Sequence, residues 1–398
     1  MLRMVAEDVK KHYYDPKFHG IDWDTRVKEA KEKVDASPSL NAAFTHIAGA
    51  LVDLNDSHTF FIPPPRPYRH DSGFHMQMIG DRCFIARIRP GSDAENKGLK
   101  AGDEVLALNG YAPSRDNLWK MNYVNETLRP QPSYHLALRS PSGATREVDV
   151  VAKMIQKGTQ VKEVLNSWDD WRRESEDNAH LRRARYVEMG DLFILKLPVF
   201  FFPESEANDL IDKARKHKAF ILDLRSNPGG AVDSLKYLLG LVFDKDVKIG
   251  DRVRRNDSKE MIAKSHGETF RGKLCVLVDS NSASASELFS RVVQIEKRGT
   301  VIGDHSSGSV MESERYSYKT GFNVIAVFGA SITDADILMT DGKSLEHSGV
   351  TPDELVLPAP IDLASDRDPV MARAAEELGI KLTPEQAGKL FPYEWPKE

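Results

Sequence analysis

Apolar residues near the start of the chain recur with the period of a helix. The positions that show it are Val27, Ala30 and Val34, followed by Ala43, Phe44, Ile47, Ala48 and Leu51. Spacings of three and four residues place each set on one face of a helix, and Pro38 with Ser39 separates the two sets. Residues 1–66 are therefore predicted to form an N-terminal helical segment, which Pro63-Pro64-Pro65 ends as a stiff connector.

The pattern changes to alternation between residues 67 and 155. Apolar and polar residues alternate around Phe74 to Met78, Tyr134 to Leu138 and Val148 to Val150, which predicts strands with one buried face. The stretch between the first two is predicted to hold a short helix that Gly98 ends, a turn at Ala101-Gly102-Asp103, a further strand, and a turn at Asn109-Gly110.

Short apolar runs alternate with helical patterns in the second half of the chain. The predicted strands are Leu192–Leu197, Ala219–Leu224, Leu274–Val278 and Thr300–Ile302, and the predicted helices are Leu210–Lys216 and Asp233–Val242. This alternation predicts a layered α/β core with crossover helices over residues 186–360. The highly charged stretch 156–185 is predicted to be a linker, helical in part. Residues 361–398 are predicted to be a helical tail. Helix is expected over Pro369–Leu390, where Met371, Ala374, Ala375 and Leu378 form one apolar stripe.

The composition excludes several classes of protein. Of the 398 residues, 40% are hydrophobic and 29% are charged, and the formal net charge is −5. An acidic balance gives no electrostatic reason to expect nucleic-acid partners. No stretch approaches the roughly 18 apolar residues of a membrane span. A chain of this length is expected to contain more than one domain.

The cysteines and histidines add two further expectations. Cys83 and Cys275 lie in separate apolar runs, so no disulfide framework is expected and the redox compartment stays open. The histidines lack the spacing of a metal site, and we expect neither a metal nor another cofactor. The first residues do not resemble a secretory signal, so the chain is either cytoplasmic or a mature form whose signal was removed or not included.

The most informative candidate for chemistry is a run of small hydroxyl residues, Ser282-Ala283-Ser284-Ala285-Ser286-Glu287. An apolar strand precedes the run and helical spacing follows it. A tight turn between a strand and a helix can present a nucleophilic serine beside backbone N–H groups and the helix dipole. The same residues also suit a plain N-cap with an acid in the first turn. The segment alone leaves both interpretations open.

A second loop follows the strand Phe220 to Leu224 and reads Arg225-Ser226-Asn227-Pro228-Gly229-Gly230. Two glycines at a strand end leave bare backbone N–H groups that can accept an anion. The same residues are typical of a tight turn, so the loop by itself is a weak signal.

The run from Pro90 to Gly110 resembles the signature of a PDZ domain. PDZ domains bind an extended peptide as an added strand and hold its C-terminal carboxylate with backbone N–H groups. The resemblance implies that residues 67–155 form the PDZ domain and that Gly73, Phe74 and His75 belong to its carboxylate-binding loop. The alternative is a PDZ fold that serves only as a structural arm.

The serine run and the glycine loop together resemble the core of the C-terminal processing peptidases and the tricorn-type serine peptidases. Three more motifs carry the resemblance: Tyr13-Tyr14-Asp15-Pro16, Asp56-Ser57-His58-Thr59 and Leu345-Glu346-His347-Ser348-Gly349-Val350-Thr351-Pro352-Asp353. The likeness extends over nearly the whole chain. It implies a crotonase-like α/β core with an N-terminal helical segment and an inserted PDZ domain, and it implies that Ser284 is a nucleophile.

One position departs from the processing peptidases, which use a Ser–Lys dyad. The lysine lies in a Phe-Gly-Lys-Gly loop in that family, and Ser309 stands in its place here. A hydroxyl cannot act as the base because its pKa is far from neutral, and Lys319 would need a large shift in register to serve. The tricorn-type branch implies a different set, in which Ser57, His58 and Glu346 accompany Ser284.

Each member of that set has an expected role. His58 would take the proton of Ser284, since an ordinary histidine pKa near 6.5 suits a base at neutral pH. Glu346 would orient these partners through Ser57, as the third member of a triad does. The simpler alternatives are a structural histidine, a surface glutamate and a turn serine. The expected oxyanion donors are the N–H groups of Ala285 and of Gly229 or Gly230.

The function predicted on this basis is a serine endopeptidase that binds the C-terminus or an exposed segment of a polypeptide and cleaves it. Two alternatives stay open, a catalytically inactive peptide-binding PDZ protein and a carrier of an apolar small molecule, because some relatives bind retinoids. The expected partner is a protein or peptide substrate, without nucleic acid or a membrane span. The sequence does not predict the oligomeric state. Relatives with signals work outside the cytoplasm, which favours a periplasmic or extracellular location.

Overall fold

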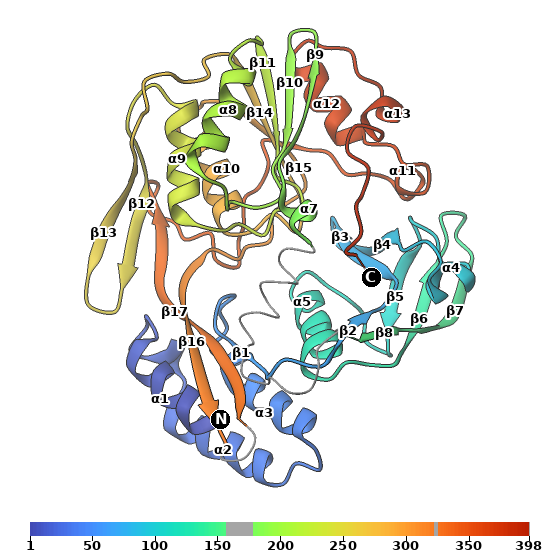
Figure 1. Ribbon diagram of the computed structural model, residues 1–398, viewed down its shortest axis with the longest axis vertical. Helices are drawn as coiled ribbons and strands as arrows, with labels where there is room; N and C mark the ends of the chain where they lie inside the picture. The colour runs from blue at the N-terminus through green and yellow to red at the C-terminus, as the bar shows by residue number, and fades with distance from the viewer. Residues whose placement is uncertain (157–177, 322–324, 398) are drawn as a thin grey trace.

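The computed structural model describes residues 1–156, 178–321 and 325–397, and it has three regions (Figure 1). A layered α/β region occupies the top of the view, and a small sheet lies at the lower right. The N-terminal helices lie at the bottom beside two long strands. No helix in the described ranges is long and apolar enough to cross a membrane.

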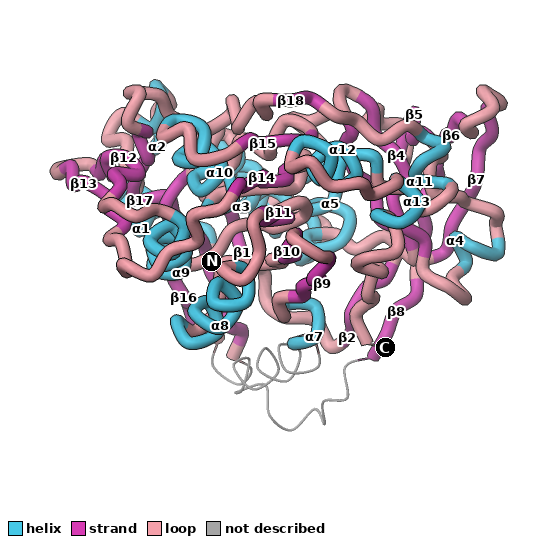
Figure 2. Tube along the Cα trace, turned by 90° about the horizontal axis from the view of Figure 1, so that it is seen from above, coloured by secondary structure: helices cyan, strands magenta, loops and turns pink. Residues whose placement is uncertain are grey.

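A six-stranded sheet forms the centre of the α/β region, in the order β18-β15-β14-β11-β10-β9. Figure 2 shows these strands stacked in that order. Neighbouring strands are parallel, except that β9 is antiparallel to β10. The strands are β9 (Arg185–Met189), β10 (Leu192–Lys196), β11 (Ala219–Asp223), β14 (Lys273–Val278), β15 (Thr300–Gly303) and β18 (Glu354–Leu355).

Helices cover both faces of this sheet. One face packs against α8 (Glu204–Ala214), α9 (Val232–Val242) and α10 (Ala285–Ile295), and the other packs against α12 (Pro369–Glu377). Because both faces are buried, the central strands are continuous apolar runs without alternation. The structure confirms the predicted strands of this core and its layered α/β arrangement.

The carboxyl ends of the parallel strands lie at one edge of the sheet. In α/β proteins this edge is where functional loops gather. The loop with Gly229 and Gly230 follows β11, and the turn with Ser284 follows β14. These two strands pair directly, so the two loops that the sequence singled out leave the sheet side by side.

A second sheet supports the N-terminal helices. Its strands run in the order β1-β17-β12-β13, and β16 pairs with β17. The strands are β1 (Phe60–Ile62), β12 (Val247–Arg254), β13 (Ser258–Ala263), β16 (Met311–Thr320) and β17 (Ala326–Met339), and the helices packed against β16 and β17 are α1 (Leu2–His12), α2 (Trp23–Asp35) and α3 (Leu40–Val52). The helical segment is confirmed, but these strands were not predicted, because β16 is mostly exposed and rich in polar residues.

The small sheet has five antiparallel strands in the order β3-β4-β5-β6-β7. Its strands are β3 (Phe74–Ile79), β4 (Arg82–Ile88), β5 (Glu104–Leu108), β6 (Ser133–Arg139) and β7 (Thr145–Val151), with the helices α4 (Asp93–Asn96) and α5 (Leu118–Asn122), a turn of π-helix over Tyr123–Leu128, and the separate pair β2 (Tyr68–Asp71) and β8 (Lys153–Gln156). The predicted strands and short helix are confirmed. Strand β3 lies at an edge, so one side of its backbone is free of a neighbouring strand in this sheet.

Two predictions beside the core had other outcomes. A continuous helix over Pro369–Leu390 is wrong: α12 ends at Glu377, and a separate helix, α13 (Pro384–Ala387), follows. Gly379, with φ of +83°, stops the first helix, and Pro384 begins the second. Of the predicted linker, residues 157–177 lie outside the described residues. The remainder includes α7 (Ala179–Arg182), and the tail also contains α11 (Pro360–Ala364).

The end of the tail returns to the small sheet. The Trp395 ring stacks on His75 of β3, with 4.8 Å between ring centroids, and the Arg89 guanidinium lies 4.6 Å from the Trp395 centroid. On the core side, Arg183 donates to Glu394 at 2.9 Å. His75 pairs in register with Arg87 of β4. The tail therefore joins the outer face of β3 and β4 to the core.

Replacing Trp395 with alanine is expected to loosen this attachment. The substitution removes one ring stack and one cation–π contact, together worth about 1–2 kcal/mol. We expect faster amide exchange in β3 and β4, with unchanged exchange in β14. Tyr111→Ala is the matched control, because Tyr111 is 72% exposed on the same small sheet. Equal exchange in both variants would show that the tail does not hold the sheet.

Candidate active site

Ser284 lies in the turn between β14 and α10, at the N-terminal end of the helix. Its backbone has φ of 53° and ψ of −116°, a conformation that is costly for a residue other than glycine. The side chain does not cap the helix, and within the described residues no hydrogen bond engages its hydroxyl. Ser284 is therefore the N-cap by position only, and its Oγ is available for chemistry.

The Ser57, His58 and Glu346 side chains form a hydrogen-bonded series. The Ser57 hydroxyl donates to Glu346 Oε2 at 2.9 Å and lies 2.7 Å from His58 Nδ1. The Ser57 backbone N–H also donates to Glu346 Oε1 at 2.7 Å. The two segments that supply these residues are 289 positions apart in the sequence. The structure thus brings together three of the four predicted residues in the predicted order.

Asp56 holds the turn that carries His58. Its Oδ1 accepts the backbone N–H groups of His58 at 2.9 Å and Thr59 at 2.7 Å, and also the hydroxyl of Thr333 at 2.6 Å. Thr333 lies in β17, so the turn is fastened to the second sheet. The Asp56 side chain is buried. The sequence pattern included Asp56 in a motif but gave it no role.

Burial shifts the titration of both ionisable groups in the series. Desolvation lowers the pKa of His58, and the nearby Asp56 carboxylate opposes part of this effect. Desolvation raises the pKa of Glu346, while hydrogen bonds from Val310 and Ser57 oppose it. A lowered histidine pKa keeps the imidazole neutral, as a base requires, at neutral pH.

Ser284 reaches this series through a neighbouring loop. The Ser284 N–H donates to the Ser309 carbonyl at 2.9 Å, and the next residue, Val310, donates its N–H to Glu346 Oε2 at 2.8 Å. No hydrogen bond between His58 and Ser284 is present among the described residues. Catalytic hydrogen bonds are often long or absent before substrate binds, so this absence does not remove His58 from the candidates.

Neither of the other two candidate bases is suited to the role. The Ser309 hydroxyl bonds to Ser307 at 2.8 Å and carries no basic group. Lys319 is exposed near the far end of β16, roughly 27 Å from Met311 at the usual rise of a strand. His58 is the only one of the three that lies in a series with Glu346.

The glycine loop lies against Ser284, and its two glycines differ. A Cβ added to Gly229 would lie 2.7 Å from Ser284 Cβ and 2.9 Å from the Ala285 nitrogen. The Gly229 N–H donates to Asn227 Oδ1 at 2.8 Å, so Gly229 is not free to bind an oxyanion. The N–H groups of Gly230 and Ala285 have no protein acceptor within the described residues, which leaves them as the candidate donors.

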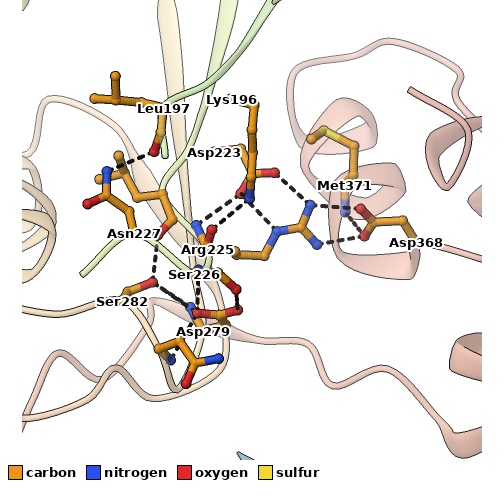
Figure 3. Close-up of polar contacts among 12 residues, drawn as sticks. Lys196, Leu197, Asp223, Arg225, Ser226, Asn227, Asp279, Ser282, Asp368 and Met371 are labelled. Carbon is orange, nitrogen blue, oxygen red and sulfur yellow. Dashed lines mark hydrogen bonds and ion pairs between the residues drawn. The ribbon is translucent and has the colours of Figure 1, made fainter. Parts of the chain in front are cut away.

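Buried polar side chains fix the glycine loop in place (Figure 3). Arg225 forms paired hydrogen bonds with Asp223 at 2.9 Å and with Asp368, the cap of α12, at 2.7 and 2.8 Å. The Lys196 ammonium lies 3.3 Å from Asp223 and donates to the Arg225 carbonyl at 2.6 Å. Arg225 and Lys196 hold the pKa of Asp223 well below its usual range, although burial raises it.

The same view shows how the glycine loop and the serine turn interlock. The Ser226 N–H donates to Asp279 Oδ1 at 2.8 Å, and the Ser282 hydroxyl donates to the Leu224 carbonyl at 2.8 Å. Asn227 accepts the Ala283 N–H on its carbonyl at 3.0 Å. The loop and the turn therefore form one unit, and sequence reasoning missed the charged residues that support it.

Glu287 is a further residue that sequence reasoning missed as part of the site. Its carboxylate is fully buried in the first turn of α10 and accepts four hydrogen bonds. Burial raises the pKa of Glu287 to about 7, although those hydrogen bonds lower it. The only signal in the sequence was an acid three residues after a possible N-cap.

The predicted carboxylate-binding loop begins β3 in the small sheet. Gly73 has φ of +78°, and an added Cβ would lie 2.6 Å from Ser92 Cβ, so the position requires glycine. Phe74 is buried, whereas His75 points to the opposite face and stacks on Trp395. The Gly73 N–H donates to Asp71 at 2.9 Å. In the described part of the chain, no group of three His, Cys, Asp or Glu side chains could hold a metal ion.

Two protein-family models match parts of this chain. Residues 193–356 match peptidase family S41, and residues 64–129 match the PDZ domain family. The carboxy-terminal processing protease CtpA of Bacillus subtilis (strain 168) is 26% identical over 343 residues, which cover 81% of this chain and 64% of that protein. A probable CtpA-like serine protease of Staphylococcus aureus (strain COL) is 24% identical, over 81% of this chain and 61% of that protein. The chain therefore spans less than two thirds of the length of these curated relatives.

Two solved structures share the fold. Mature CPAF superimposes with a TM-score of 0.68 at 15% identity and covers 91% of this chain and 94% of its own. The photosystem II D1 C-terminal processing protease superimposes with a TM-score of 0.56 at 17% identity, covering 97% and 98%. Likenesses at this level of identity concern the fold alone. The likeness to peptidase family S41 is located at residues 193–356, and the likeness to the PDZ domain precedes it at residues 64–129.

Proposed function

We propose that this protein is a serine endopeptidase in which Ser284 is the nucleophile and His58 is the general base. The hydrogen-bonded series from Glu346 through Ser57 to His58, beside a serine in a strained turn, is the observation that carries the proposal. A strained turn that frees a hydroxyl at a helix N-terminus is typical of nucleophilic serines. The match of residues 193–356 to peptidase family S41 supports the same activity.

The series supports Nε2 of His58 as the nitrogen that acts as the base. The single Ser57 proton is donated to Glu346, so the Ser57 oxygen accepts a hydrogen bond from His58 Nδ1–H. His58 Nε2 then carries a free lone pair. Glu346 therefore acts on His58 through the hydroxyl of Ser57, which orients the ring and stabilises the positive charge that forms on it.

The reaction follows acyl transfer in two steps. Ser284 Oγ attacks the peptide carbonyl while His58 Nε2 takes its proton, and the carbonyl oxygen becomes an oxyanion between the N–H groups of Ala285 and Gly230. The C–N bond breaks as His58 gives the proton to the leaving amine. Water then attacks the acyl-enzyme by the same route in reverse, which releases the acid and restores Ser284.

The PDZ domain is proposed to bind the substrate polypeptide. Strand β3 has a free edge, which suits addition of a peptide as an extra strand. The far end of β3 contacts the serine turn, since Gln77 donates to Asp279 at 2.8 Å and Ser280 donates to the Met78 carbonyl at 2.6 Å. A cavity of about 540 Å³ lies between β3 and the carboxyl ends of the core strands. A polypeptide bound along β3 would therefore extend towards Ser284. No nucleic-acid partner is part of this proposal.

We also propose that the core has the crotonase-like topology implied by the family resemblance. The parallel order of β15, β14, β11 and β10, with helices on both faces, supports this assignment. In that arrangement the backbone donors and the nucleophile come from neighbouring strands of one sheet.

Labelling with a fluorophosphonate probe tests the proposed activity. The wild-type protein is expected to react with the probe and to cleave an unstructured polypeptide, whereas Ser284→Ala is expected to do neither. Ser142→Ala is the control, because Ser142 is an exposed serine in a turn of the small sheet. Failure of the wild-type protein to react, or reaction that survives in Ser284→Ala, would leave an inactive peptide-binding protein or a small-molecule carrier as the better description.

A further inference from the structure

Glu287 is a fully buried carboxylate with an unusual number of partners. Its Oε2 accepts the N–H groups of Ser284 at 2.9 Å and Ser309 at 3.0 Å. Its Oε1 accepts the hydroxyl of Ser306 at 2.6 Å and the N–H of Gly308 at 2.7 Å. Burying a carboxylate is costly unless hydrogen bonds replace its water. Four donors at these distances make that replacement.

Helix capping explains only one of the four hydrogen bonds. A glutamate at the third position of a helix ordinarily bonds the N–H of the N-cap residue, which is Ser284 here. The other three donors come from the loop of Ser306 to Ser309, which follows β15. The carboxylate therefore joins the nucleophile to a loop from the neighbouring strand.

This loop is in turn bonded to the segment that contains Glu346. Val310 donates to Glu346 Oε2 at 2.8 Å, and His347 donates to the Gly308 carbonyl at 2.8 Å. The fit at Gly308 is tight, because an added Cβ would lie 2.9 Å from the carbonyl carbon of His347. A continuous path of hydrogen bonds thus runs from Ser284 through Glu287 and the loop to Glu346.

We propose that Glu287 is a positioning residue that sets the placement of Ser284 relative to the Glu346–Ser57–His58 series. This inference rests on the proposed peptidase activity. The carboxylate keeps the strained backbone of Ser284 in place and fixes the loop whose Val310 N–H holds Glu346. It touches neither the substrate nor the proton that is transferred.

The chemistry of the site requires a carboxylate of this length. A glutamine has one acceptor oxygen, and its NH₂ group would face backbone N–H donors that need an acceptor. The N–H of Gly308 or that of Ser309 would then be left without an acceptor, whichever way the amide is turned. An aspartate keeps both oxygens but is shorter by one methylene, so it could serve one pair of donors at a time.

The test compares Glu287→Gln and Glu287→Asp with Glu296→Gln, in the full chain. Glu296 caps the other end of α10 and pairs with Lys245, so it serves as a matched control. We expect Glu287→Gln to lower kcat about 100-fold with little change in KM, since small misplacements of reacting groups cost this much. Glu287→Asp is expected to recover part of the loss, and Glu296→Gln to behave as wild type. The rate of fluorophosphonate labelling should fall in parallel with kcat.

A second variant keeps the test decisive if Glu287→Gln does not fold. Ser306→Ala removes one donor to the carboxylate and leaves the charge in place, and it should lower kcat by about tenfold. Wild-type kcat in Glu287→Gln, Glu287→Asp and Ser306→Ala would overturn the inference. A fall in kcat/KM that came from a higher KM alone would also overturn it. If the wild-type protein itself is not labelled at Ser284, the proposed function fails first, and that result is distinct from normal labelling in the Glu287 variants.

Discussion

Replacing His58 with alanine is expected to lower kcat by about 10⁴-fold or more, because loss of one member of a serine triad removes nearly the whole effect of the unit. Binding of a peptide to the PDZ domain should be unaffected, since His58 lies in the turn fastened to β17. The measurement is single-turnover cleavage of a peptide, together with the rate of probe labelling at Ser284.

The pH dependence of the wild-type protein tests the assignment of His58 as the general base. The proposed base acts in its neutral form, so kcat/KM should rise with pH as His58 loses its proton. Burial lowers the pKa of His58 below the ordinary 6.5, so the rise should be centred below pH 6.5. Lowering the pH through this range should also destabilise the fold, because the unfolded chain binds the proton more readily.

Lys319→Ala is the matched control for this prediction. Lys319 is the alternative base that the sequence left open, and it is exposed near the far end of β16. The variant should keep both its activity and its pH profile. Loss of activity in Lys319→Ala with retention in His58→Ala would show that the base was assigned wrongly.

Replacing Gly229 with alanine is expected to have the second largest effect. Its Cβ would lie 2.7 Å from Ser284 Cβ, 2.8 Å from the Ala283 carbonyl and 2.9 Å from the Ala285 nitrogen, and its φ is +97°. Two of these contacts are with backbone atoms, so the serine turn itself must move. We expect kcat to fall about 10³-fold and the free energy of unfolding to fall by about 3 kcal/mol.

Gly267→Ala separates the cost of the backbone conformation from the cost of the clash. Gly267 has φ of +80°, yet an added Cβ would meet nothing within 4 Å. This control should lose about 1 kcal/mol of stability and no activity. Chemical denaturation and peptide cleavage measured on both variants give the comparison. Equal kcat in Gly229→Ala and the wild type would remove the glycine loop from the proposed site.

The core was predictable from the sequence because its strands are buried on both faces. Short apolar runs such as the one from Phe220 to Leu224 are typical of strands buried on both faces of an α/β sheet. The strand β16 was missed because it is rich in polar residues and only Met311 and Tyr318 are buried in it. The strand β17 was missed although its residues from Phe328 to Thr333 are buried. The tail was predicted to be helical from Pro369 to Leu390, but its apolar stripe ends at Leu378, and the backbone turns at Gly379.

The candidate site shows a similar division. Motifs pointed to Ser57, His58, Ser284 and Glu346. The structure places Ser57 in hydrogen bonds with both Glu346 and His58, and the catalytic roles stay predictions. The glycines were indistinguishable in the sequence, and only the hydrogen bond from Gly229 to Asn227 separates Gly229 from Gly230. The partners of Glu287 could not be predicted either, because they depend on how the loop after β15 folds back onto α10.

The separation of Ser57 and Glu346 by 289 positions has a consequence for the newly made chain. Ser57 and His58 are translated first, Ser284 follows, and Glu346 comes last of the four. A nascent chain therefore carries the proposed nucleophile before the carboxylate that accepts the Ser57 hydroxyl exists. A ribosome-bound intermediate that has not yet reached Glu346 would lack the hydrogen-bonded series, so the proposed peptidase activity would arise only after that residue has been added.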